Sequence, residues 1–282
     1  MIMNIGIRLH DTMPGTLEER LVYARAQGFS CVHLAMSKVM EGFRMDDAPA
    51  LLTPVLADRV RKALDENGIE CAVLGCYLKL ATKDPEELAH TREIYRAHLR
   101  FARLIGARAV GTETPPSDSL GWNADDVRSG DALSLFTECL RPLALCAEEE
   151  GTLLAVEPVC DHIVSTPERM MRVLNDIGSG HLRVILDAVN LIASADVGRA
   201  QEVVDTAVGL LGDSTEILHM KDFVPAPGQR RPAASACGTG RMRYDSLLAL
   251  AARRGIPMTL ENTTPQNAEQ TRLYLERLAS AL

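Results

Sequence analysis

Four apolar stretches in the second half of the chain each end in a residue type that binds metal ions. They read LLAVEP, RVILDAVN, EILHMKD and PMTLEN, and the residues in question are Glu157, Asp187, His219 and Glu261. Three carboxylates and one neutral imidazole carry a formal charge of about −3. Carboxylates crowded together without a cation would repel one another and retain protons at neutral pH. The residue types therefore predict a site for one divalent cation.

The donor set narrows the choice of ion without deciding it. Three oxygen ligands and one nitrogen suit Mn²⁺, Mg²⁺, Co²⁺ or Zn²⁺, and we take Mn²⁺ as the working expectation. Lys221, two residues after His219, is expected to offset part of the negative charge from outside the ligand set. Alternatively, each carboxylate alone could cap a helix or form a salt bridge, and His219 could be a hydrogen-bonded structural residue. Four such residues on consecutive strands favour the metal site.

Short β-branched stretches alternate with amphipathic stretches along the whole chain. Strands are expected at residues 4–10, 30–36, 70–78, 107–113, 152–158, 182–190, 216–222 and 256–262. Helices are expected at residues 16–28, 52–68, 84–106, 131–151, 165–178, 196–212, 244–255 and 266–282. Such alternation implies a parallel sheet with right-handed crossovers, and eight units match a single-domain (β/α)8 TIM barrel over residues 1–282. The alternative is a doubly wound sheet, which normally has a glycine-rich loop after its first strand. The loop HDTMPGT has one glycine.

A barrel would bring the four residues together. The functional groups of such barrels lie at the C-terminal ends of the strands. Neighbouring strands lie about 4.8 Å apart, so four consecutive strand ends span roughly 15 Å of the curved rim. Side chains from strands five to eight could then reach one ion from several directions.

Composition argues against several other classes of protein. The chain has 282 residues and a formal net charge of −8, so nucleic acid is an unfavourable partner. No apolar run approaches the roughly 20 residues that span a bilayer, and no basic segment precedes the first apolar run as in a signal peptide. The seven cysteines are scattered without a CxxC pair. Free thiols in the cytoplasm fit this pattern.

On these residues the chain resembles the xylose isomerase-like barrel superfamily. The resemblance lies in AVEPV, VILDAVN, ILHMKDF and TLENT, and in GTGRMRYDSLLALAARRGIPMTLEN near the C-terminus. It implies that Glu157, Asp187, His219 and Glu261 bind one divalent metal ion, which polarises a substrate carbonyl. It also implies that Glu157 and Glu261 are the catalytic acid/base pair. One would remove the proton beside the carbonyl and the other would return it, which gives epimerisation or, at the neighbouring carbon, isomerisation.

Two positions depart from the pattern of sugar epimerases in that superfamily. Asn190 stands where they commonly have a histidine, and Pro225 stands where they have an arginine. Both of those family residues orient the substrate carbonyl. A ketohexose epimerase therefore fits less well than a broader isomerase of sugars, sugar phosphates or polyols. Asn190 and Lys221 are expected substrate contacts.

Other polar residues near the predicted strand ends are candidates for substrate binding. Glu113 ends the fourth strand, His10 ends the first, and His162 follows the fifth. Trp122 lies in a long loop at 112–130 and could stack on a sugar ring or anchor its loop. Glu113 could instead be a strand-end cap, and His162 could form a loop hydrogen bond. A second long loop is expected at 223–240.

The same site leaves other functions open. A dehydratase of keto-sugars would use the same ion and base but would expel water. A hydrolase of abasic DNA would bind three metals and need more histidine and glutamate ligands than the strand ends offer. A non-catalytic barrel would bind a ligand without needing the metal residues. We expect an isomerase or epimerase of a small sugar or polyol, and the resemblance adds the expectation of a homodimer.

Overall fold

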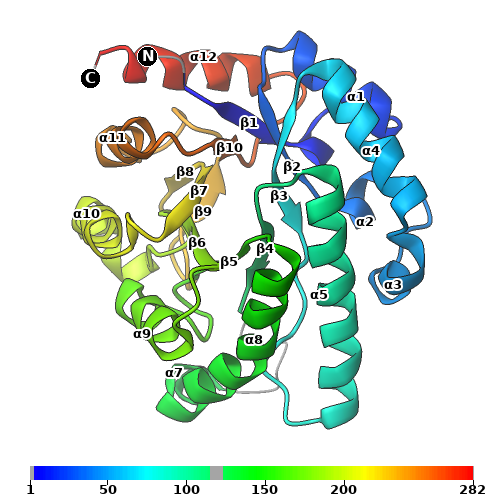
Figure 1. Ribbon diagram of the computed structural model, residues 1–282. Helices are drawn as coiled ribbons and strands as arrows, with labels where there is room; N and C mark the ends of the chain where they lie inside the picture. The colour runs from blue at the N-terminus through cyan, green and yellow to red at the C-terminus, as the bar shows by residue number, and fades with distance from the viewer. Residues whose placement is uncertain (1–2, 115–122, 282) are drawn as a thin grey trace.

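The computed structural model describes residues 3–114 and 123–281, and its strands close into a barrel. Within those residues eight parallel strands follow one another around the ring in the order β1-β10-β7-β6-β5-β4-β3-β2, and β2 pairs with β1 to complete it. Helices cover the outside of the strands (Figure 1). The prediction of a single (β/α)8 TIM barrel is confirmed.

Each barrel strand is followed by a long helix, as the alternating pattern predicts. The strands are β1 (Ile5–Arg8), β2 (Cys31–Leu34), β3 (Glu70–Gly75), β4 (Val110–Glu113), β5 (Leu154–Glu157), β6 (Leu182–Asp187), β7 (Thr215–Met220) and β10 (Met258–Leu260). The long helices are α1 (Leu17–Ala26), α4 (Pro54–Asn67), α5 (Pro85–Ile105), α8 (Gly130–Glu150), α9 (Pro167–Ile177), α10 (Ala200–Leu211), α11 (Asp245–Arg254) and α12 (Ala268–Ala279). Shorter helices within the loops are α2 (Met36–Val39), α3 (Ala48–Leu51) and α7 (Ala124–Arg128), with 3-10 turns at Leu9–Asp11, Met45–Asp47 and Ser194–Arg199.

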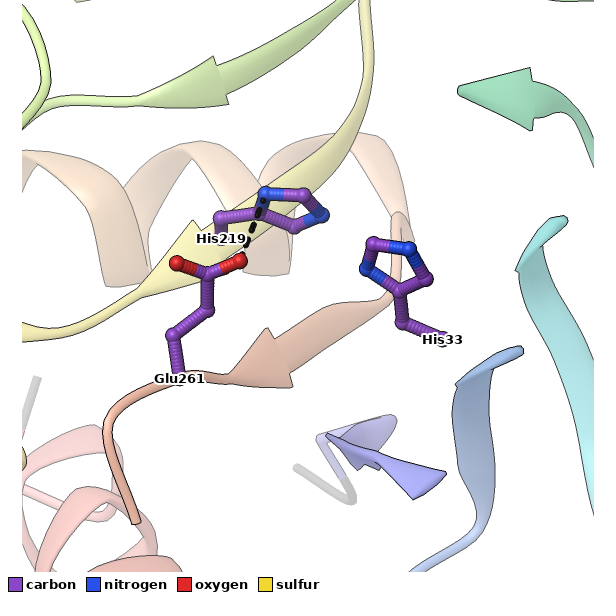
Figure 2. Close-up of side chains that lie close together, drawn as sticks. All are labelled: His33, His219 and Glu261. Carbon is purple, nitrogen blue, oxygen red and sulfur yellow. Dashed lines mark ion pairs between the residues drawn. The ribbon is translucent and has the colours of Figure 1, made fainter. Parts of the chain in front are cut away.

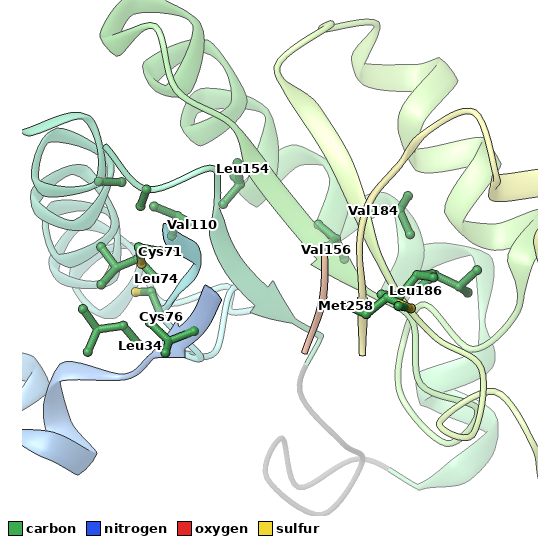
Figure 3. Close-up of a cluster of buried hydrophobic side chains, with 14 of the residues drawn as sticks. Leu34, Cys71, Leu74, Cys76, Val110, Leu154, Val156, Val184, Leu186 and Met258 are labelled. Carbon is green, nitrogen blue, oxygen red and sulfur yellow. The ribbon is translucent and has the colours of Figure 1, made fainter. Parts of the chain in front are cut away.

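The strands separate two hydrophobic regions because successive side chains point to opposite faces. One face points into the barrel and forms a small buried cluster of Val73, Ala109, Ala155, Ile185 and Ile217. The other face packs against the helices in the main core, part of which is drawn in Figure 3. Strands buried on both faces read as continuous apolar runs, which is why the sequence revealed them. Residues two positions beyond the inner cluster also point inward, at the C-terminal mouth.

Local sequence signals fix the helix ends. Asp84 caps α5 by accepting two backbone N–H groups of the first turn, and Pro85 occupies its first position. Gly68 ends α4 in the left-handed conformation with φ of 58°. Thr166 caps α9, and α8 continues through Pro142. The bounds of these four helices agree with the expected ones to within two residues, whereas α10 begins at Ala200, after a 3-10 turn, and not at residue 196 as expected.

The segment after β7 contains a hairpin where the sequence predicted only a loop. β8 (Asp222–Val224) pairs antiparallel with β9 (Ala233–Ser235). The carboxylate of Asp222 accepts the backbone N–H groups of Phe223 and Met242 at 2.8 Å and of Gly238 at 3.0 Å. The bonds from Gly238 and Met242 tie the chain that follows β9 to Asp222 at the start of the hairpin.

Most of the cysteines lie in the interior of the fold. All seven cysteines are free; six are buried, and Cys160 is partly exposed. Burial raises the pKa of the Cys71 thiol to about 12, so that buried thiol stays protonated and unreactive. Within the described ranges, no helix combines the length and the hydrophobicity that crossing a bilayer requires.

Candidate metal centre

The four residues expected to bind a metal ion lie at the C-terminal mouth of the barrel. Glu157 is the last residue of β5, Asp187 is the last of β6, His219 lies in β7, and Glu261 directly follows β10. All four are buried, with exposed fractions of 4, 0, 1 and 7%. Asp187 and His219 are register partners across β6 and β7. They point inward because they lie two residues beyond the interior Ile185 and Ile217.

His219 lies between the two glutamates. Its Nδ1 is 3.1 Å from Glu157 Oε2 and 3.2 Å from Glu261 Oε1. Donor atoms of Glu157, Asp187 and His219 all lie within 4.8 Å of one another, a spacing that fits ligands around one ion. Nε2 of His219 has no hydrogen-bond partner within the described residues. A buried imidazole with one nitrogen between two carboxylates and the other without a partner is consistent with a site for a divalent cation.

Lys221 makes closer contact with these carboxylates than the sequence predicted. Its Nζ lies 2.7 Å from Asp187 Oδ2 and donates a hydrogen bond to Glu261 Oε2 at 3.1 Å. Burial lowers the pKa of Lys221, but the charges of Asp187 and Glu261 outweigh it, so the net pKa is raised and the ammonium keeps its charge. Lys221 therefore offsets one of the negative charges at the centre.

The remaining charges perturb the pKa values of their neighbours. Burial is the largest cause that raises the pKa of Asp187 to about 6, and Glu261 and Glu157 add to it. Burial disfavours the charged form of His219, yet Glu157 and Glu261 raise its pKa to about 9. The pKa of Glu261 is lowered because Lys221, His219 and Arg8 together outweigh the effect of burial. The carboxylates of the centre thus interact strongly with each positively charged or protonatable group beside them.

Asn190 forms hydrogen bonds with two of the four residues, Glu157 and Asp187. Its Nδ2 donates to Glu157 Oε1 at 2.6 Å, and its backbone N–H donates to Asp187 Oδ1 at 3.1 Å. The side chain also lines the cavity described next. Asn190, expected as a substrate contact, is therefore placed to orient Glu157 as well.

A cavity of about 340 Å³ opens beside the centre, and it contains several expected substrate contacts. His10, Glu113 and Asn190 line it together with Glu157 and Glu261. Glu113 is the register partner of Glu157 across β4 and β5. Burial, followed by the charge of Glu157, raises the pKa of Glu113 to about 7, so this carboxyl can carry a proton near neutrality.

Two expected substrate contacts that the structure describes, His162 and Lys221, do not line this cavity. His162 is buried near Asp161, with 3.8 Å between Nε2 and Oδ1, and is not part of the cavity lining. Trp122 lies outside the described residues. A neighbouring cavity of about 740 Å³ lies over Lys221 and Asn190 and is bordered by Arg231, which pairs with Asp161 at 3.3 Å.

Two residues that lie at the centre, Arg8 and His33, were not expected there from the sequence. Arg8, the last residue of β1, places Nη1 3.6 Å from Glu261 Oε2. His33 of β2 stacks on His219, with ring centroids 5.2 Å apart and an angle of 18° between the planes. A signal for both existed, because each is a polar residue that ends or interrupts an apolar strand (NIGIRLH and SCVHLAM).

Comparisons with known proteins agree with this architecture. A family model described as xylose isomerase-like TIM barrel matches residues 21–280. The 3-keto-D-glucoside 4-epimerase YcjR from E. coli gives a TM-score of 0.75 at 15% identity, over 98% of this chain and 100% of that chain. The probable 3-DHS dehydratase AsbF from Bacillus anthracis gives 0.72 at 13% identity, over 98% of both chains.

A third solved structure is the IOLI protein with a bound zinc atom, with a TM-score of 0.71 at 15% identity over 98% of both chains. At such low identities the structural likeness shows the fold alone. A search of curated proteins finds no match. The family model, however, covers nearly the whole chain. This chain belongs to the xylose isomerase-like TIM barrel family.

Proposed function

We propose that the protein is a divalent-metal-dependent isomerase or epimerase of a small sugar, sugar phosphate or polyol. The observation that carries this proposal is the position of two carboxylates around one imidazole at the barrel mouth. Glu157 and Glu261 approach His219 Nδ1 at 3.1 and 3.2 Å, beside a cavity large enough for a small sugar. Two carboxylates on different strands can reach a substrate from two directions, as moving a proton between two faces or two carbons requires.

Glu157, Asp187, His219 and Glu261 are the residues that would hold the ion. A divalent ion bound there would act as a Lewis acid that polarises a substrate carbonyl and makes the adjacent C–H more acidic. Lys221 reduces the negative charge of the ligand set through Asp187 and Glu261. Asn190 holds one oxygen of Glu157 and leaves Oε2 facing His219.

The surroundings of the two glutamates support different roles for them in proton transfer. Glu261 contacts the ammonium of Lys221 and lies 3.6 Å from the guanidinium of Arg8, and nearby cations weaken a carboxylate as a base. Glu157 accepts a hydrogen bond from the neutral amide of Asn190. Glu157 is therefore the base that removes the proton, and Glu261 is the partner that exchanges a proton on the other side of the substrate.

The test is proton exchange in D₂O with a panel of ketoses, ketose phosphates and keto-polyols, read by NMR. We expect deuterium at the carbon beside the carbonyl. Glu157→Gln should abolish that exchange, because the amide cannot accept the proton, and Glu261→Gln should abolish net conversion. Glu138→Gln, an exposed substitution on α8, is the matched control and should behave as wild type.

Other outcomes would redirect or overturn the proposal. Loss of water with formation of an absorbing enone would identify a dehydratase that uses the same residues. Binding of a sugar without exchange in any substrate would indicate a ligand-binding barrel. Purified protein that binds no divalent ion when ions are supplied would overturn the metal-dependent mechanism.

A further inference from the structure

His33 of β2 is a buried histidine that the proposed mechanism leaves without a role. Its exposed fraction is 3%, and neither ring nitrogen has a hydrogen-bond partner among residues 3–114 and 123–281. Burying a polar group without a partner is unfavourable by roughly 1–3 kcal/mol. Space is left for the ring, because a Cβ at Gly75 would lie 2.8 Å from His33 Nε2. The fold therefore accommodates a buried imidazole whose two nitrogens are not hydrogen-bonded within the described residues.

The ring of His33 lies against the proposed metal centre. Figure 2 shows His33 and His219 side by side near the carboxylate of Glu261. Donor atoms of His33, His219 and Glu261 all lie within 4.8 Å of one another, and all three residues are buried. This triad shares His219 with the triad of Glu157, Asp187 and His219. Two sets of ligand-type atoms thus meet at a single imidazole.

Both nitrogens of the His33 ring are left without a hydrogen-bond partner within the described residues. A neutral imidazole retains a lone pair on one nitrogen, which can bind a metal ion. The nearly parallel stacking on His219 also limits the orientations of the ring. His33 is therefore a nitrogen donor whose position is restricted by its neighbour.

We infer that His33 is a ligand of the catalytic ion, so that the centre has two histidines rather than one and takes an ion of the zinc and cobalt class. This inference rests on the proposed function, which assigns an ion to the centre. Imidazole nitrogen suits Zn²⁺ and related transition metals, whereas Mg²⁺ and Mn²⁺ prefer sites made of oxygen ligands. A second imidazole changes the sequence-based expectation of Mn²⁺ to Zn²⁺ or Co²⁺.

Two substitutions separate coordination from other roles of His33. His33→Phe keeps a flat ring that can stack on His219 but removes both nitrogens. His33→Gln keeps a hydrogen-bonding group that could contact a substrate hydroxyl but removes the imidazole. His98→Asn is the matched control: His98 is also a buried histidine, but it lies on α5, where its Nδ1 contacts the carbonyl of Ile94 at 2.8 Å.

The readouts are ion binding and spectroscopy and do not depend on turnover. Zn²⁺, Mn²⁺ and Mg²⁺ affinities are measured by competition with a chromophoric chelator, and the visible absorption of the Co²⁺-loaded protein is recorded. We expect wild type to bind Zn²⁺ more tightly than Mg²⁺. Both His33 variants should lose at least about tenfold in Zn²⁺ affinity, because loss of a residue that only hydrogen-bonds to a metal ligand already lowers metal affinity about 10–100-fold. Their Co²⁺ bands should shift, and His98→Asn should match wild type.

The possible failures are distinguishable. If wild type binds Zn²⁺ and both His33 variants keep its affinity and Co²⁺ spectrum, His33 is not a ligand, while the proposed function stands. If His33→Phe keeps the wild-type affinity, stacking explains the residue and the inference is overturned. If wild type binds none of the ions, both the inference and the metal-dependent function fail. Circular dichroism and thermal unfolding show whether each variant is folded.

Discussion

Lys221 and Asp187 form a buried ion pair at the centre of the barrel mouth, with 2.7 Å between Nζ and Oδ2. The side chains are 6% and 0% exposed, so solvent screens the pair little. The same ammonium binds Glu261. The ammonium of Lys221 thus contacts two carboxylates, those of Asp187 and Glu261, that would also bind the proposed divalent ion. This relationship predicts that Lys221 and the ion stabilise the fold through the same negative charges.

Replacing Lys221 with methionine should make the fold depend on a divalent ion. Removing one partner of a buried pair leaves uncompensated charge, which typically costs about 3–5 kcal/mol. We expect the free energy of unfolding of Lys221→Met in chelator to fall by that order, and saturating Zn²⁺ to restore more stability than in wild type. Urea unfolding with and without the ion measures both effects.

The control for this prediction is Lys62→Met. Lys62 forms an exposed pair with Glu66 at 3.7 Å on α4, and pairs of that kind contribute at most about 1 kcal/mol. Its stability should show no added dependence on the ion. Equal stability of Lys221→Met and wild type in chelator would contradict the idea that the ammonium balances these carboxylates.

Substituting Asn190 with alanine should weaken the ion site without removing a ligand. The amide of Asn190 orients Glu157 through a 2.6 Å hydrogen bond, and partners of this kind typically contribute 10–100-fold in metal affinity, or about that much in activity. We expect Zn²⁺ affinity to fall by about that factor, measured by chelator competition. Gln201→Ala, which removes an exposed amide on α10 bonded to Asp205, is the control and should have no effect.

Whether the sequence could reveal a residue of this site depends on the position of that residue in its strand. Glu157, Asp187 and Glu261 each stand at the end of an apolar strand. Because the C-terminal ends of all strands in a TIM barrel lie at the same mouth, these residues could be predicted to lie together. His33 and His219 are far apart in the sequence, on opposite halves of the barrel, and only closure of the ring brings them into contact. Their proximity depends on side-chain packing at the centre of the barrel, which strand periodicity does not specify.

The hairpin after β7 escaped prediction for a different reason. Its strands are only three residues long each, and most of their residues are exposed or partly exposed, so they carry no apolar periodicity. The hairpin is held in place by Asp222, whose carboxylate accepts hydrogen bonds from backbone N–H groups up to 20 residues further along the chain. A single buried carboxylate that organises a loop leaves little trace in the hydrophobic pattern.

Gly240→Ala should therefore destabilise the hairpin segment. A Cβ at Gly240 would lie 2.2 Å from Phe223 O and 2.4 Å from Asp222 Oδ1, so the hairpin must shift and its hydrogen bonds must weaken. Overpacking of this kind typically costs about 1–3 kcal/mol. Urea unfolding measures the loss, and hydrogen exchange at the amides of Met242 and Gly238 locates it.

Gly180→Ala provides the comparison, since a Cβ there meets no atom within 4 Å. It should change the free energy of unfolding by no more than about 0.5 kcal/mol. Fast exchange confined to the hairpin amides in Gly240→Ala would support the role of Asp222. Unchanged exchange at those amides would show that the segment is held by other contacts.

The stability of the fold should depend on pH through His98, a buried residue that lies away from the metal centre. Burial lowers the pKa of His98 to about 4, from an ordinary value of 6.5, although its contact with the Ile94 carbonyl acts in the opposite direction. The unfolded chain therefore binds the proton more strongly than the folded one between these values. The contribution of His98 is fully present above pH ~6.5 and is lost as the pH falls towards ~4. Acidification from pH 7 to 5 should cost about 2 kcal/mol through this residue.

His98→Asn isolates that contribution, because the asparagine amide can donate to the same carbonyl but does not titrate. Urea unfolding of wild type and variant at pH 7, 6 and 5 gives the difference, in which the titration of residues at the metal centre cancels. We expect the wild type to lose more stability than the variant with each step towards acid. Parallel curves for the two proteins would mean that His98 accepts a proton in the folded state as readily as in the unfolded chain.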